Sequence, residues 1–132
     1  MKIDQGGLTV EMVLLAPALM VMVLFGVHSG RLSEAKVQVQ HAADQGARAG
    51  SLANQSKMVS VAKSATETDL MLTGVSCRKL SISVDNVDIG GVSAVQVRVS
   101  CVVRVDGTEL LGLLPDQVSA SSIEVIDAWR IP

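Results

Sequence analysis

The sequence predicts an α+β protein with a long N-terminal membrane-spanning and stalk helix, a second short helix, and a small antiparallel sheet of about three strands. Three observations support this fold class. Residues 8–27 are almost wholly apolar, residues 30–72 follow a helical period, and after Gly74 the pattern changes to the alternation typical of strands. The chain has 132 residues, which is enough for one small folded domain and not two.

The composition points to a membrane and away from nucleic acid. Hydrophobic residues make up 48% of the chain and the mean hydropathy is +0.43, which is high for a soluble domain. The net charge is -2, and the aromatic residues are Phe25 and Trp129. Without a basic face or aromatic platforms, the sequence predicts no nucleic-acid partner.

The apolar run at residues 8–27 would span roughly 30 Å as a helix, the thickness of a bilayer core. A secretory signal has a shorter apolar core followed by a small-residue cleavage site. No such site follows this run, so we expect it to be retained.

Glu11 is the one charged residue inside that run. An acid at the centre of a membrane helix costs about 3 kcal/mol, and less near an edge, where Glu11 lies. Two interpretations remain: Glu11 marks the membrane edge, or it has a cationic partner. A fixed partner would come from another chain or from a newly made amino terminus.

A stalk helix is predicted over residues 30–53, with one face made mainly of small residues. That face comprises Leu32, Ala35, Val39, Ala42, Ala43, Gly46 and Gly50. Two GxxxG strings, Gly26 to Gly30 and Gly46 to Gly50, allow helix backbones to approach closely. The partner of these glycines is either the next helix of the same chain or the helix of a neighbouring subunit.

A second helix is predicted over residues 57–72. Ser56 is a candidate N-cap and Gly74 a natural stop. The predicted apolar face consists of Met58, Val61, Ala62, Ala65 and Leu72.

Residues 79–85 and 93–105 alternate in polarity and predict a β-hairpin, with a third strand at about residues 118–129. The first strand would place Leu80, Ile82 and Val84 on one face. The second strand would do the same with Val95, Val97, Val99 and Cys101.

Cys77 and Cys101 are the two cysteines. A turn centred on Ile89 sets them opposite each other, but that register misaligns the apolar faces, and a one-residue slip that aligns them separates the cysteines. A bulge, or Cys77 lying just outside the strand, would reconcile the two demands, and we favour the second. We expect a disulfide, the alternative being two buried thiols. A disulfide places the C-terminal part outside the cytoplasm.

No catalytic constellation is present in the sequence. There is no CxxC, HExxH, P-loop or GxSxG motif. The two histidines, His28 and His41, would lie roughly 20 Å apart on one helix, too far to share a metal ion. The sequence therefore predicts no enzyme, no cofactor, no metal site and no small-molecule substrate.

The string GGLTVEMVLLAPALMVMVLFGV, together with the later QHAADQGARAGS, resembles the TadE-like pilin proteins of tight-adherence (Tad, or Flp) pili. The resemblance covers residues 6–50 and is weaker beyond, where LLGLLP at residues 110–115 also resembles the family. The chain departs from the family at Met12, where an aromatic residue is common, and in a leader whose sole base is Lys2.

The resemblance implies a type IV prepilin-like N-terminus that a prepilin peptidase cuts between Gly6 and Gly7. Glu11 then becomes the fifth residue and pairs with the freed amine of Gly7 on a neighbouring subunit. The implied domains are a leader at 1–6, a transmembrane helix at 7–28, a helical stalk at 29–74 and an extracytoplasmic β domain at 75–132.

The function implied is that of a minor pilin or pilus-assembly component involved in surface adhesion, since major subunits of these pili are shorter and lack a β domain. The expected partners are the membrane, other pilin subunits, the prepilin peptidase and the pilus assembly platform. The expected location is the cell membrane, as a single-pass protein, and then the pilus or cell surface. Two alternatives stay open: a pseudopilin of a type II secretion or DNA-uptake machine, and an uncleaved single-pass binding domain.

Overall fold

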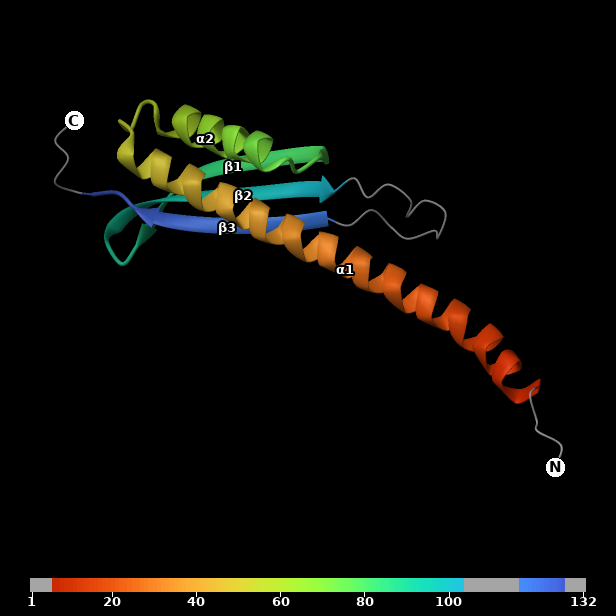
Figure 1. Ribbon diagram of the computed structural model, residues 1–132. Coiled ribbons are helices and arrows are strands. Elements are labelled where there is room, and N and C mark those ends of the chain that lie inside the picture. The colour runs from red at the N-terminus through yellow and green to blue at the C-terminus, as the bar shows by residue number, and fades with distance from the viewer. Residues whose placement is uncertain (1–5, 104–116, 128–132) are drawn as a thin grey trace. The chain divides into compact units, whose positions relative to one another are not determined.

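The computed structural model describes residues 6–103 and 117–127, and it confirms the α+β class (Figure 1). The elements are helices α1 (Gly6–Leu52) and α2 (Met58–Thr73) and strands β1 (Cys77–Ile89), β2 (Val92–Val103) and β3 (Gln117–Val125). The strands form one antiparallel sheet in the order β1-β2-β3. The chain divides into two compact units, Met1–Ser33 and Glu34–Pro132.

The first unit contains the apolar part of α1. Its most apolar 18-residue window has a mean hydropathy of 2.4, and none of that window is buried. By length and composition, α1 is therefore able to cross a membrane. The helix includes Pro17 and continues through the predicted boundary between residues 28 and 29 without a break.

In the second unit, the C-terminal part of α1 packs through the small-residue face that the sequence predicts. Six of the seven predicted positions are buried, and Leu32, in the first unit, is half-buried. The buried positions are Ala35, Val39, Ala42, Ala43, Gly46 and Gly50. Short side chains at these positions let α1 lie close to its neighbours, because little volume separates the backbones.

The apolar face of α2 differs in part from the prediction. Its buried residues are Met58, Ala62, Thr66 and Leu70. Val61 and Leu72 were predicted to be buried, but Leu72 is 81% exposed and Val61 is also exposed. Because each helical residue turns by about 100°, Leu72 lies about 200° around the helix from Leu70 and cannot share its face.

The sequence predicts the C-terminal end of α2 correctly but not its N-terminal cap. Gly74 ends the helix with a φ of 74°, and its N–H donates to the carbonyl of Met71 at 3.4 Å. A left-handed residue at this position is the common glycine cap. At the other end Lys57 occupies the N-cap without a side-chain hydrogen bond, so the prediction of Ser56 as the cap is wrong.

The sheet has one covered face, which the second-strand alternation predicts correctly. Val95, Val97, Val99 and Cys101 of β2 are all buried. The side chain of Val95 lies beside Gly50 of α1, which places the stalk part of α1 on this face. The opposite face carries mainly polar side chains, among them Ser81, Arg98 and Ser119.

The hairpin register differs from both predicted registers. Gly90 and Gly91 form a two-residue turn with positive φ values of 62° and 87°, so Ile89 pairs with Val92 at the end of the strands. The Gly-Gly pair favours this tight turn because glycine adopts positive φ without steric cost. The resulting register pairs Ile82 with Val99, which aligns the apolar faces.

A bulge, rather than a residue outside the strand, reconciles the cysteines with that register. Cys77 lies within β1 opposite Val103, and the register shifts between Cys77 and Lys79. Because Val103 and Cys101 are two positions apart on β2, they share one face, and Cys77 reaches Cys101 diagonally. The favoured position of Cys77 outside the strand is therefore wrong, and the bulge alternative is right.

The third strand ends earlier than predicted, at Val125. Trp129 and the segment at residues 110–115 lie outside the described residues.

Candidate assembly surfaces

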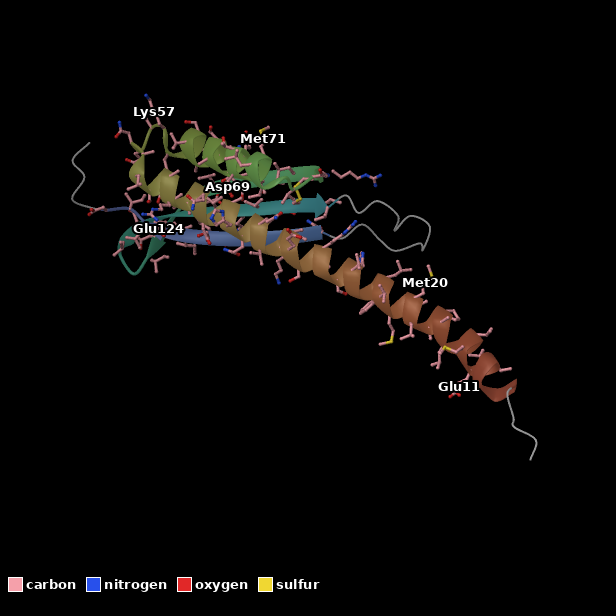
Figure 2. All side chains as sticks on the ribbon, viewed as in Figure 1. Glu11, Met20, Lys57, Asp69, Met71 and Glu124 are labelled. Carbon is pink, nitrogen blue, oxygen red and sulfur yellow. A yellow bond between two sulfur atoms is a disulfide. The ribbon has the colours of Figure 1, made fainter. Side chains whose placement is uncertain are left out.

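Glu11 is an exposed acid near the N-terminal end of α1 (Figure 2). Its apolar neighbours are exposed as well: Val10 by 62%, Met12 by 68% and Val13 by 72%. Gly7 and Glu11 both lie within α1, so they are about one helical turn apart. A carboxylate among unburied apolar side chains needs either water or a cationic partner.

The two GxxxG strings lie in different environments. A Cβ atom added to Gly26 or Gly30 would have no heavy atom within 4 Å among the described residues. A Cβ at Gly46 would meet the side-chain oxygen of Thr66 and, at 3.1 Å, the carbonyl of Ala62. Gly50 lies equally close to α2, since its Cβ would be 3.1 Å from that of Ala62. Gly46 and Gly50 therefore pack within the chain, and Gly26 and Gly30 present an open helix surface.

Gly46→Ala is expected to weaken the packing of α1 on α2 by about 1–3 kcal/mol, because the added methyl overfills a tight contact. Thermal unfolding of the full chain in detergent, followed by circular dichroism, measures the loss. The matched control is Gly26→Ala, which meets nothing and should leave the transition unchanged or slightly raised. Adding Thr66→Ala should restore part of the loss, and additive effects of the two substitutions would contradict the proposed clash.

A polar contact also joins the two helices. His41 Nδ1 on α1 and Asp69 Oδ2 on α2 are 2.9 Å apart. The hydrogen bond to Asp69, and then its negative charge, raise the pKa of His41 above its usual 6.5, and Asp44 adds to the effect. The sequence did not predict this contact, because its partners are far apart in the chain.

The contact between His41 and Asp69 predicts a pH-dependent stability. Because folding raises the pKa of His41, its contact with Asp69 stabilises the fold fully below about pH 6.5. This stabilisation is lost as the pH rises through the folded-state pKa of His41. The melting temperature of the full chain should exceed that of His41→Gln by more at about pH 5.5 than at about pH 8.5. The effect is expected to be modest, since His41 is largely exposed. An equal difference at both pH values would show that the imidazolium does not contribute.

The sequence analysis also missed a groove between α1 and α2. It has a volume of about 470 Å³, and no strand residue lines it. Each helix contributes four positions with the spacing i, i+3, i+4 and i+7, namely Gln45, Arg48, Ala49 and Leu52 of α1 and Ala65, Thr68, Asp69 and Leu72 of α2. The sequence predicts Leu72 to lie on the apolar face of the second helix, so it gives no signal of this groove.

Cys77 and Cys101 form a disulfide, with their Cα atoms 5.3 Å apart. It joins the N-terminal end of β1 to the central strand. Within residues 6–103 and 117–127, no group of three or more His, Cys, Asp or Glu side chains is arranged to hold a metal ion.

Comparison with known families supports the resemblance seen in the sequence. Residues 6–48 match the family model described as TadE-like protein. The match covers the apolar part of α1 and most of its stalk part. Neither the curated proteins nor the solved structures give a significant match to the chain.

Proposed function

We propose that this chain is a minor pilin or pilus-assembly component of a Tad-type pilus that takes part in surface adhesion, because residues 6–48 match the TadE-like family model. The observation that carries the proposal is that the family match and an exposed apolar helix with a single acid coincide in α1. The family match begins at Gly6, and the part of α1 from residue 10 to residue 30 is largely apolar, exposed except for half-buried His28, and charged at Glu11 alone. A pilin needs these features, because its helix is held first by lipid and later by other subunits.

The proposed mechanism is physical. A prepilin peptidase cuts between Gly6 and Gly7, and the new amino terminus lies one turn from Glu11. Within an assembly, the carboxylate of Glu11 pairs with the amine of Gly7 on a neighbouring subunit. Away from water the carboxylate and the amine attract each other strongly, and either charge buried without its partner costs free energy. The pair therefore selects subunits that have been cut.

The folded second unit supports a minor rather than a major role. It carries a three-stranded sheet with a disulfide beside two helices. A disulfide persists in an oxidising compartment, which favours a C-terminal unit outside the cytoplasm. The proposed route is insertion as a single-pass precursor, cleavage, transfer to the assembly platform, and display on the pilus or cell surface.

The proposal is tested by blocking the cut with Gly6→Leu in cells that make the pilus. The expected result is a full-length chain that stays in the membrane and is missing from the sheared pilus fraction, as judged by immunoblotting. The matched control is Gly26→Leu, which adds the same bulk to the helix away from the cut and should still be cleaved. Uncut Gly6→Leu chain in the pilus fraction would contradict the proposal.

A further inference from the structure

The end of the second unit where α1 enters it brings together parts of three elements. α1 and α2 are antiparallel, because His41 contacts Asp69 while Gly50 lies beside Met58. The C-terminal end of α2 therefore lies at the same end of the helix pair as Glu34, the first residue of the unit. β1 begins a few residues after α2 ends, so its first residues lie at this end as well (Figure 1).

Three large apolar side chains at this end are mostly exposed. Val37 of α1 is exposed by 66%, Met71 of α2 by 83% and Leu72 of α2 by 81%. Figure 2 shows Met71 near the C-terminal end of α2. Exposed apolar side chains that gather at one end of a folded unit indicate an interaction surface.

The charges at this end favour an anionic partner. Residues 34–37, 71–73 and 77–80 contain three bases and one acid, all of them exposed: Lys36, Arg78, Lys79 and Glu34. Bases beside exposed apolar side chains are typical of surfaces that lie on membranes, because the apolar groups enter the headgroup region while the bases attract anionic lipids. The long stems of lysine and arginine let their charges stay in water.

The membrane is also the partner that the chain itself brings close to this end. Residues 28–33 separate the second unit from the apolar run at residues 8–27, and α1 is long and apolar enough to hold that run in a bilayer. A surface tethered this closely meets lipid at a high effective concentration, so weak contacts suffice. A tilt of α1 in the bilayer, of which membrane helices show up to about 40°, lowers one side of this end to the lipid headgroups.

The apolar and basic side chains at this end are called the basal patch: Lys36, Val37, Met71, Leu72, Arg78 and Lys79. We propose that the basal patch rests on an anionic lipid surface while α1 is in the membrane. The contact holds the folded second unit on the membrane before assembly, and entry into a pilus breaks it. This inference rests on the membrane anchoring that is part of the proposed function, and on neither cleavage nor pilus formation.

The test is photo-crosslinking to lipid, with the purified full chain reconstituted in vesicles of phosphatidylcholine and phosphatidylglycerol in equal parts. A benzophenone amino acid replaces Met71, and the intact mass of the chain reports lipid adducts. The matched control places the same amino acid at Val59, an exposed residue near the other end of α2. We expect at least about ten times more lipid adduct at Met71 than at Val59, because only Met71 belongs to the basal patch.

Benzophenone at Leu19, an exposed residue of the apolar run, shows whether α1 lies in the bilayer. This variant should form lipid adducts in every vesicle preparation. A Leu19 variant without adducts would overturn both the inference and the membrane anchoring on which it rests.

Charge variants test the role of the bases. Arg78→Gln with Lys79→Gln should reduce the Met71 adduct at least about tenfold, because each base near an anionic surface strengthens binding by about fivefold. Vesicles of phosphatidylcholine alone should cause a similar loss. Lys57→Gln with Lys63→Gln removes the same charge from exposed positions of the second unit outside the basal patch and should leave the adduct unchanged.

Three results would overturn the inference: equal lipid adducts at Met71 and Val59, a Met71 product with a second protein chain in place of lipid, or equal losses in the two charge variants. Cleavage and pilus incorporation are measured separately in cells. A chain that enters pili but forms no Met71 adduct with lipid therefore refutes the membrane contact and leaves the proposed function standing.

Discussion

Glu11→Ala is expected to leave membrane insertion intact and to reduce incorporation into pili by at least about a hundredfold. Removing one member of a buried ion pair costs roughly 3–5 kcal/mol, because the other charge stays buried without a partner. Each 1.4 kcal/mol corresponds to about a factor of ten. The measurement is the ratio of the chain in sheared pili to the chain in the membrane, by quantitative immunoblotting.

Two further variants show whether charge is the cause. Glu11→Gln keeps the shape of the side chain and removes its charge, so it should fail as Glu11→Ala does. Glu34→Ala removes another exposed acid of α1, one that accepts a hydrogen bond from Gln38 at 3.3 Å, and should assemble normally. Normal incorporation of Glu11→Gln would refute the pairing role of the carboxylate.

Replacing both cysteines, Cys77→Ala with Cys101→Ala, should destabilise the sheet by about 3 kcal/mol. The disulfide joins residues 24 positions apart, and in the chain-entropy model a loop of this size restricts the unfolded chain by about that amount. Hydrogen exchange of the full chain in detergent reports the change locally. Amides of β1 and β2 that exchange by unfolding of the sheet should exchange about a hundredfold faster.

Reductant provides the control for the cysteine variant. Adding dithiothreitol to the wild-type chain should raise its exchange rate to that of the double variant. The variant itself should not respond, since it has no bond to reduce. Unchanged exchange of the reduced wild-type chain would show that the disulfide adds little to the stability of the sheet.

The sequence predicts helix faces well where the residues themselves limit the packing. The face from Ala35 to Gly50 in α1 is correct, because its small side chains fit only a close helix contact. The face of α2 is less certain from sequence, since its buried stripe includes Thr66 while Leu72 is exposed. Leu72 follows the apolar pattern and nevertheless lies exposed in the groove, because an exposed leucine and a buried leucine have the same sequence signature.

The hairpin shows that the register of two strands cannot be predicted without knowing the type of turn that joins them. Residues 86–91 are rich in turn formers, so the sequence predicts a turn centred on Ile89. Ile89 belongs to the strand instead, and the Gly90–Gly91 turn sets every pair in the ladder. The bulge that brings Cys77 to the correct face adds one unpaired residue, which alternation alone does not reveal. The contact between His41 and Asp69 depends on how α1 and α2 pack together, so local sequence patterns do not predict it either.

The central claim is that the working form of this chain begins at Gly7, because that cut creates the amine with which Glu11 is proposed to pair. N-terminal sequencing of the chain recovered from the membrane and from sheared pili tests the claim directly, with the intact mass as a second readout. The account predicts a sequence beginning Gly-Leu-Thr-Val-Glu in both fractions of piliated cells. A chain in the pilus fraction that still begins at Met1 would contradict it.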